Sequence, residues 1–215
     1  MQQIILTAPK EKLANCITTV FLTRLIRESY DQGNNDFVLN TQDTQIDGLA
    51  SDFRATNLKL TIKGNTGHYY GYNSQGCNFV IEGDVNGWGG YYSRNCTYLI
   101  KGNAGNLFGL ASKDCYCFIK GDVGEWCGNA SKGSIYIIEG DVDRLCGRLS
   151  KNGTYIVKGN IGPECGDSST NCTFKTSNKE TYENMLKWVP QKDDKGQPTN
   201  NKVELIQNDR DKTST

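Results

Sequence analysis

Nine cysteines make thiol chemistry the first possibility to test in this sequence of 215 residues. Stacked thiolates bind soft metal ions and iron–sulfur clusters, so the spacing of the cysteines decides their interpretation. Seven of them form two series with a spacing of 19 residues or a multiple of it: Cys77, Cys96, Cys115 and Cys172, and Cys127, Cys146 and Cys165. The same period runs through residues that bind no metal, and cysteine suits a tight buried corner. We therefore expect packing cysteines, and no metal or cofactor bound by this chain.

Aspartates, serines and one histidine are the other candidates for chemistry. Asp84, Asp122 and Asp141 follow the same period, which resembles the spacing of calcium ligands in β-rolls. Here a full repeat separates successive carboxylates and half of the column is asparagine, so we expect bonds to backbone amides at turns. His68 has no carboxylate or cysteine pattern beside it, and the serine column has no base to activate a hydroxyl. The sequence thus predicts no catalytic residue.

The elements that carry these residues are six successive 19-residue repeats, from about Gly64 to Ser177. A unit of this length is too short to bury its own apolar face, so the units must stack. The most regular positions are glycines, which we expect at structural turns: Gly64, Gly71, Gly83, Gly90, Gly102, Gly109, Gly121, Gly128, Gly140, Gly147, Gly159 and Gly166.

Each repeat also contains a strand pattern, such as Cys77-Asn78-Phe79-Val80-Ile81-Glu82, in which alternate residues face opposite ways. Parallel strands joined by such short units stack about 4.8 Å apart and favour a right-handed path. The predicted fold is all-β: a right-handed, single-stranded parallel β-helix of six coils, preceded by a degenerate first coil around Phe37-Val38-Leu39. Two further columns hold only Gly, Asn or Asp, for which we expect positive φ: Gly67, Asn86, Gly105, Gly124, Asp143 and Gly162, and Gly76, Asn95, Asp114, Gly133, Asn152 and Asn171.

Three segments are predicted: residues 1–57 as an N-terminal cap, 58–176 as the β-helix, and 177–215 as a second cap with a tail. An amphipathic helix is expected over about residues 10–30. Its apolar stripe comprises Leu13, Ile17, Phe21 and Leu25, with Leu22 and Ile26 beside it. Ser177 and Glu180 form a capping-box pattern that opens a short helix ending before Pro190. Residues 191–215 are polar and predicted to be disordered.

Two features exceed what the repeat requires and are candidate interaction surfaces. One is a ladder of apolar residues on the outward face of the strands, which we expect the N-terminal segment to cover. The other is a group of aromatic residues in the first two coils, a residue class enriched at protein interfaces. The ladder comprises Val80, Leu99, Phe118, Ile137 and Ile156, and the aromatic group comprises Tyr69, Tyr70, Tyr72, Trp88, Tyr91 and Tyr92.

Charge and hydropathy exclude several classes of partner. The 24 basic residues equal the 24 acidic ones, so the sequence indicates no basic field for nucleic acid. One exposed column, from Lys63 through Glu82 and Lys101 to Lys158, mostly alternates in sign. The apolar runs are too short to span a bilayer, and residues 1–7 lack the pattern of a signal peptide. We expect a cytoplasmic protein with reduced thiols, for which a homo-oligomer is possible.

Units of the form Ile-Lys-Gly-Asp-Val-Gly-x-x-x-Gly-x-x-Ser, seen at residues 119–131, resemble the GXGXG β-helix family. That family includes the C-terminal domain of the glutamate synthase large subunit and the β-helical subunit of formylmethanofuran dehydrogenase. The stretches Leu25-Ile26-Arg27-Glu28, Phe37-Val38-Leu39 and Ile62-Lys63-Gly64-Asn65-Thr66-Gly67 are similar to the stand-alone archaeal form of the glutamate synthase domain. Residues 4–10 are closer to the formylmethanofuran enzyme's β-helical subunit. In both, Gly-Gly commonly precedes the strands, where this chain has Gly-Cys, Asn-Cys or Asp-Cys.

The resemblance implies a β-helix without catalytic residues that joins the subunits of an oxidoreductase or amidotransferase complex. Those partner subunits would carry FMN, iron–sulfur clusters, or molybdenum or tungsten. Glutamate-synthase-like and formylmethanofuran-dehydrogenase-like assemblies both remain open. A third alternative is a carbohydrate-active β-helix enzyme, but a strict 19-residue period and a single histidine fit its known forms poorly.

Overall fold

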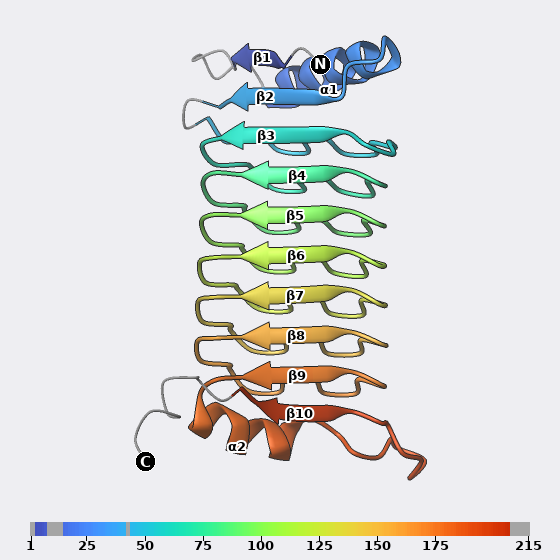
Figure 1. Ribbon diagram of the computed structural model, residues 1–215, viewed down its shortest axis with the longest axis vertical. Coiled ribbons are helices and arrows are strands. Elements are labelled where there is room, and N and C mark those ends of the chain that lie inside the picture. Colours follow the sequence, from blue (N-terminus) through green and yellow to red (C-terminus); the bar gives the residue numbers. More distant parts are fainter. Residues whose placement is uncertain (1–2, 8–14, 42–43, 207–215) are drawn as a thin grey trace, which may run out of the picture.

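The chain folds into a right-handed parallel β-helix of about seven turns with a helix at each end, as a computed structural model shows (Figure 1). The structure describes residues 3–7, 15–41 and 44–206, with the side chains of 15–17 left out. Within these residues no helix is long and apolar enough to cross a bilayer. The elements are β1 (Ile4–Thr7), α1 (Asn15–Asp31), β2 (Asp36–Asn40), β3 (Lys59–Lys63), β4 (Asn78–Ile81), β5 (Thr97–Ile100), β6 (Tyr116–Ile119), β7 (Ile135–Ile138), β8 (Thr154–Val157), β9 (Thr173–Thr176), α2 (Lys179–Trp188) and β10 (Lys202–Leu205).

The ten strands form one parallel sheet in chain order, and the 19-residue period is its register. Phe79 pairs with Tyr98, and Tyr98 with Cys117, so equivalent residues stack directly on one another. Alternate strand residues point inward and are buried, such as Phe79 and Ile81 in β4. Burial of each such side chain contributes roughly 1.5–3 kcal/mol to stability. Coils this short can bury these side chains only by stacking on one another. The predicted fold is confirmed.

The two glycine columns exist for different physical reasons. Gly128 and its equivalents have φ near +60°, a conformation that favours glycine. Gly121 does not, but a Cβ there would lie 2.7 Å from the backbone oxygen of Gly102 in the preceding coil. Close stacking therefore selects this column. Among the further turn columns, positive φ is confirmed for the one from Gly76 to Asn171 and is wrong for the one from Gly67 to Gly162, whose glycines likewise lack room for a Cβ.

Two further columns, in which several side chains are bulky, also adopt left-handed backbone. The sequence analysis did not predict this. Trp88 and Leu107 have φ of 65° and 64°, and Tyr92 and Leu149 have φ of 57° and 58°. For residues with a Cβ this conformation is strained by roughly 1–2 kcal/mol each. The turn between the strands thus contains left-handed residues at fixed places, and this geometry decides which of its side chains face outward.

The N-terminal end of the stack is closed by α1, with β1 beside β2 as an additional edge strand (Figure 1). Leu22 and Ile26 of α1 are buried in the core, whereas Phe21 is 64% exposed. The predicted helix is confirmed over the described residues, and Leu22 and Ile26, expected beside the apolar stripe, are its buried residues. The prediction is wrong for Phe21, which faces outward, and Leu25 is half-buried. The expected start at residue 10 lies outside the described residues, and β1 was not predicted.

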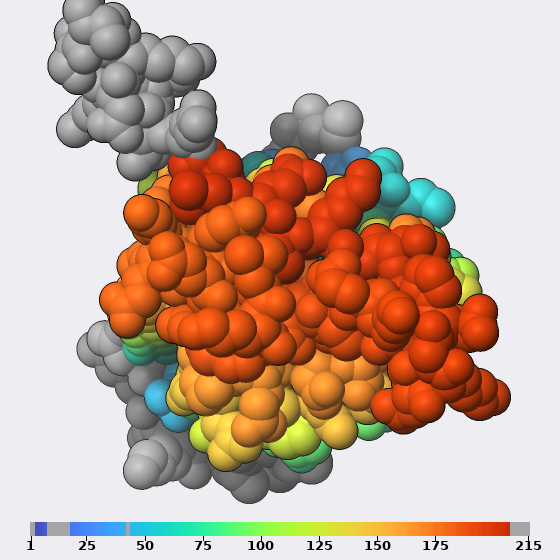
Figure 2. All heavy atoms as spheres, turned by 90° about the horizontal axis from the view of Figure 1, so that it is seen from below, coloured from blue at the N-terminus to red at the C-terminus, as the bar shows by residue number. Residues whose placement is uncertain are grey.

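The C-terminal end is covered by α2 and by the segment that leads to β10, which together hide the last coil in an end-on view (Figure 2). Met185 of α2 is fully buried against this coil. The helix is capped by Asn178, whose side chain accepts a hydrogen bond from the N–H of Thr181, rather than by the predicted Ser177.

The segment after α2 corrects the prediction of a disordered tail. Residues 202–205 form β10 and pair with β9 in register. Asn201 is buried, accepts a hydrogen bond from the N–H of Cys172 over 2.9 Å and donates to the carbonyls of Ser169 and Pro190. Backbone pairing and one buried amide therefore order a sequence that has little apolar content. Residues 207–215 lie outside the described residues.

Candidate interaction surfaces

Five aromatic rings form a continuous cluster on the turn side of the first two coils, which we call the aromatic patch: Tyr69, Tyr72, Trp88, Tyr91 and Tyr92. Tyr69 stacks on Trp88 with ring centroids 5.7 Å apart, and Tyr91 stacks on Tyr92 at 4.1 Å. Tyr69 and Tyr92 are 43% and 44% exposed, and the other three are half-buried. A hydrogen bond with Tyr92 raises the pKa of Tyr91 to about 12, so the Tyr91 phenol stays a neutral donor at physiological pH.

Tyr70, the sixth aromatic residue predicted for this surface, lies inside the molecule instead. It is fully buried, and its ring meets Phe79 edge-on at 5.1 Å. Burial raises the pKa of Tyr70 well above its ordinary value, and its hydroxyl has no hydrogen-bond partner in the described part of the chain. The left-handed backbone of Tyr69 turns neighbouring side chains to opposite sides, which the one-dimensional period does not reveal.

The outward apolar ladder is present and is half-buried along the strand face. Val80, Leu99, Phe118, Ile137 and Ile156 stack in register from β4 to β8, and each keeps part of its surface accessible. The ladder ends at Thr61 in β3 and at Lys175 in β9.

The expectation that the N-terminal segment covers this ladder is wrong for the described residues. Instead, α1 packs on the first coil at the end of the stack. Arg27 donates to the carbonyl of Asp52 and lies over the Phe53 ring, and the Tyr30 hydroxyl donates to Asn57. The helix α1 lies across the end of the solenoid and covers the core there. It does not cover the apolar ladder on the strand face.

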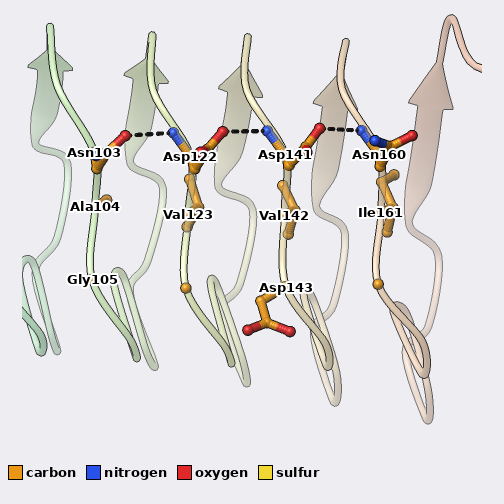
Figure 3. A pocket seen from close by; sticks show the side chains of 12 residues that line it. Asn103, Ala104, Gly105, Asp122, Val123, Asp141, Val142, Asp143, Asn160 and Ile161 are labelled. Carbon is orange, nitrogen blue, oxygen red and sulfur yellow. Dashed lines mark hydrogen bonds between the residues drawn. The ribbon is translucent and has the colours of Figure 1, made fainter.

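The acidic column forms a hydrogen-bonded ladder at one corner of the coils (Figure 3). From Asn65 to Asp141, each side-chain oxygen accepts from the backbone N–H of the equivalent residue in the following coil, over 2.7–2.8 Å. The Asn160 oxygen accepts from the side-chain amide of Asn178 over 2.8 Å. The predicted turn role is therefore confirmed. We call this column the Asx ladder; it comprises Asn65, Asp84, Asn103, Asp122, Asp141 and Asn160.

A shallow groove of about 570 Å³ runs beside this corner along four coils, with Val123 and Val142 on its apolar wall (Figure 3). Its walls combine the Asx ladder with glycines and small apolar side chains. Asp143 is the one carboxylate that departs from the ladder, and its oxygen accepts from the N–H of Arg144 over 2.7 Å. One oxygen of each of the three aspartates that line the groove, Asp122, Asp141 and Asp143, thus accepts a hydrogen bond from a backbone N–H.

Eight cysteines are buried and unpaired in the described structure, and no group of three potential metal ligands forms among the described residues. Burial raises the pKa of the Cys117 and Cys165 thiols far above their ordinary values. Cys77, Cys96 and Cys115 stack on one another, and hydrogen bonds to the middle thiol raise the pKa of the two outer ones. The side chain of Cys16 lies outside the described residues.

Serine and tyrosine hydroxyls form a buried network between coils. Ser93 donates to the carbonyl of Gly90 over 2.6 Å, and Ser112 lies 2.8 Å from the Tyr136 hydroxyl, which donates to Gly109. These contacts satisfy polar groups inside the core, and none of the serines has a base beside it in the described structure.

Four successive coils each present an exposed cation at the same position, which the sequence analysis did not predict. Arg94, Lys113, Lys132 and Lys151 pair in register through parallel bridges and are all exposed; we call this row the basic ladder. The prediction that the chain has no basic field is therefore wrong for this row of residues. The net charge of the whole chain is zero because acidic residues elsewhere balance these cations. The signal was available, since these residues occupy one column of the 19-residue grid.

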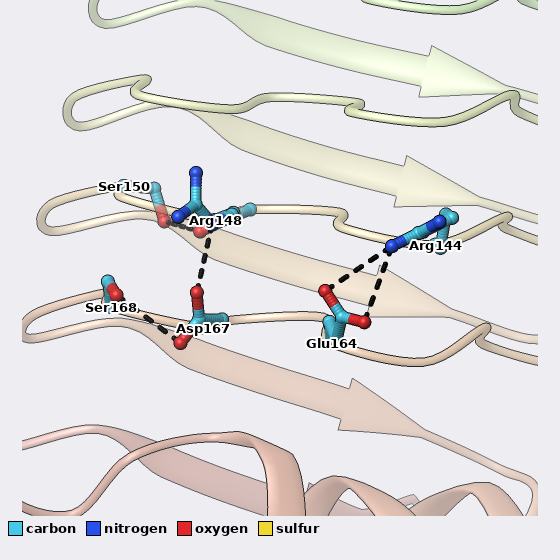
Figure 4. A network of polar contacts seen from close by, with 7 residues as sticks. Arg144, Arg148, Ser150, Glu164, Asp167 and Ser168 are labelled. Carbon is cyan, nitrogen blue, oxygen red and sulfur yellow. Dashed lines mark hydrogen bonds and ion pairs between the residues drawn. The ribbon is translucent and has the colours of Figure 1, made fainter.

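Other charges in the molecule are paired across coils. Lys101 binds Glu82 at 3.1 Å and Lys158 binds Glu139 at 2.6 Å on the alternating column. In the last two coils Arg144 binds Glu164 at 3.3 Å, and Arg148 binds Asp167 at 2.9 Å (Figure 4). Within the basic ladder only Lys113 has an acidic partner among the described residues, Asp114 at 3.8 Å.

Comparison with known proteins gives no relative: no family model, no curated protein and no solved structure matches the chain.

Proposed function

We propose that this chain is a non-catalytic scaffold that binds a protein partner through the aromatic patch. The observation that carries the proposal is the patch itself: five contiguous rings, all at least partly exposed, occur only in the first two coils of the described solenoid. The later coils keep their stacking with residues such as Leu, Asn or Arg at most of the equivalent positions, so the fold does not require these rings. Tyr and Trp are the residues that most often supply binding energy at protein interfaces.

The acidic corner is occupied by backbone hydrogen bonds, and the buried thiols and hydroxyls lie in the core. The surface that remains is formed by side chains that repeat from coil to coil on a continuous parallel sheet. A rigid frame with an aromatic patch suits the joining of subunits better than the turnover of a small substrate.

For the identity of the partner we propose a subunit of an oxidoreductase or amidotransferase complex of the glutamate synthase type. The support is the resemblance of the repeat to the GXGXG family, together with the helix, strand and first coil that precede it. A scaffold of the formylmethanofuran dehydrogenase type is the alternative, supported by residues 4–10. The two differ in the partner's cofactor: FMN and iron–sulfur clusters in the first, molybdenum or tungsten in the second.

Affinity capture from a native extract tests the proposal. The wild-type chain is compared with a patch variant, Tyr69→Ser with Trp88→Ser and Tyr91→Ser, and with a control, Tyr116→Ser with Ile135→Ser, which alters exposed apolar residues elsewhere. We expect a stoichiometric partner with the wild type and the control, and its loss with the patch variant. The visible absorption and metal content of the partner then distinguish the two complexes. Equal recovery by all three chains would disprove a role for the patch.

A further inference from the structure

The basic ladder is a row of like-charged residues that receives no acidic partner from a neighbouring coil of the described solenoid. Its four members carry the same sign, and Arg94, Lys132 and Lys151 form no ion pair with any described residue. Arg54 extends the row by one more cation beyond Gln75, to which it pairs by a parallel bridge. Adjacent cations in register about 4.8 Å apart repel each other, so this arrangement opposes folding and is not explained by stability.

The alternating column gives an internal comparison within the same coils. There Glu82 binds Lys101 and Glu139 binds Lys158, each pair joining two neighbouring coils. In the basic ladder no cation is paired with an acidic residue of a neighbouring described coil. An uncompensated row of cations indicates a partner that supplies the negative charges.

The geometry of the row restricts that partner to a linear one. The cations lie in single file along the axis of a straight stack, one to a coil. Exposed Tyr92 and Leu149 lie two residues before the ladder in their coils, and Tyr116 and Ile135 lie three residues after it. The bordering columns also present the amides of Asn95 and Asn152 and the hydroxyls of Thr97 and Thr154, which are uncharged hydrogen-bonding groups.

We propose that the basic ladder binds one chain of a linear acidic polysaccharide, laid along the solenoid axis with its carboxylates on the cations. A pyranose unit in such a chain has nearly the length of one coil rise, and successive carboxylates of an extended chain point to alternate sides, so every second carboxylate faces the cations. Neighbouring amides and hydroxyls bond the sugar hydroxyls, and the exposed rings of Tyr92 and Tyr116 contact the apolar sugar faces.

Other polyanions fit the row less well. A membrane surface presents its charges in two dimensions, whereas the cations here are confined to one column, and the neighbouring column carries the acidic Asp114. A single-stranded nucleic acid gains affinity by stacking each base on an aromatic ring, and the two exposed tyrosines lie in different columns and different coils. The proposal concerns a different ligand class from the protein partner of the aromatic patch, and the two surfaces meet at Tyr92.

Titration of the full chain with a short polygalacturonate, followed by calorimetry, tests the inference. Its methyl-esterified form is the matched ligand control, because it keeps the sugar chain and removes the charges. The ladder variant combines Arg94→Gln, Lys113→Gln, Lys132→Gln and Lys151→Gln. A control variant changes four cations of the alternating column, Lys63→Gln, Lys101→Gln, Lys120→Gln and Lys158→Gln, and circular dichroism checks that both variants fold.

We expect binding of the acidic chain only, weakened about tenfold or more in the ladder variant and retained in the control variant. Because the attraction is between charges, affinity should fall as the salt concentration rises from about 50 to 200 mM. No binding at low salt, equal binding of the esterified chain, or an equal loss in the control variant would overturn the inference. So would tighter binding of oligothymidylate or of phosphatidylserine vesicles than of polygalacturonate.

Discussion

Tyr70 shows how a single residue departs from the pattern of its neighbours. Its ring fills the core of the first coil, but its hydroxyl is buried without a partner in the described structure. Tyr136, three coils later, has the opposite arrangement, because its hydroxyl contacts Ser112 and donates to Gly109. An unsatisfied buried hydroxyl costs free energy, and a satisfied one contributes a little.

These two tyrosines make a matched pair of substitutions. Tyr70→Phe should raise the free energy of unfolding by about 1 kcal/mol, because it removes the unpaired hydroxyl. Tyr136→Phe should lower the free energy of unfolding by about 1 kcal/mol, because it leaves its partners unsatisfied. Urea denaturation of both variants measures the difference. A loss of stability in Tyr70→Phe as large as that in Tyr136→Phe would mean that the first hydroxyl has a partner.

The buried thiols give a second prediction at the residue scale. Burial raises the pKa of Cys117 and Cys165 far above normal, and the bond of Cys146 to Cys127, together with burial, raises the pKa of Cys146. At pH 8 these groups should be protonated and unreactive toward iodoacetamide in the native protein. The unfolded thiols ionise near pH 8.5, so the contribution of these three thiols to stability should be constant below that pH and fall as the pH rises above it. Mass spectrometry after labelling, with and without urea, checks the first point, and native labelling of any of the three would contradict it.

At the scale of elements, the period predicted the coils and their register but not the ends. Columns such as Phe79, Tyr98 and Cys117 repeat because stacked strands share an environment, so the pattern is visible in one dimension. β10 is ordered by backbone pairing and by Asn201, and neither leaves an apolar signal in the sequence. The direction of the side chains in the turns could not be predicted either. Left-handed residues such as Tyr69 decide which rings point inward, and the period does not show which residues are left-handed.

Asn201 provides the test of the C-terminal cap. Asn201→Ala removes an acceptor for Cys172 N–H and a donor to two carbonyls, so the free energy of unfolding should fall by roughly 2–4 kcal/mol. Lys202→Ala, an exposed neighbour, is the control and should change it by less than about 0.5 kcal/mol. Thermal denaturation of the two variants decides the matter. Identical melting temperatures would mean that this segment is not docked in solution.

At the scale of the whole molecule, a neutral chain carries separate surfaces of distinct character. One corner holds the aspartates of the Asx ladder, another the basic ladder, and the turn side of the first coils holds the aromatic patch. Composition alone averages these corners to zero charge, which is why it suggested no basic field. Reading the sequence in rows of 19 restores the columns, including that of Arg94 to Lys151. The partner of a surface is not encoded in that period, because stacking constrains only the residues that face the core.

The central claim is that the aromatic patch is where a protein partner docks. Its most direct test places a photo-crosslinking amino acid at position 88, within the patch, and at position 120, on the alternating column, in cells that naturally make the protein. We predict one discrete crosslinked product from position 88 and none from position 120. No product from position 88, or the same product from both positions, would contradict the claim.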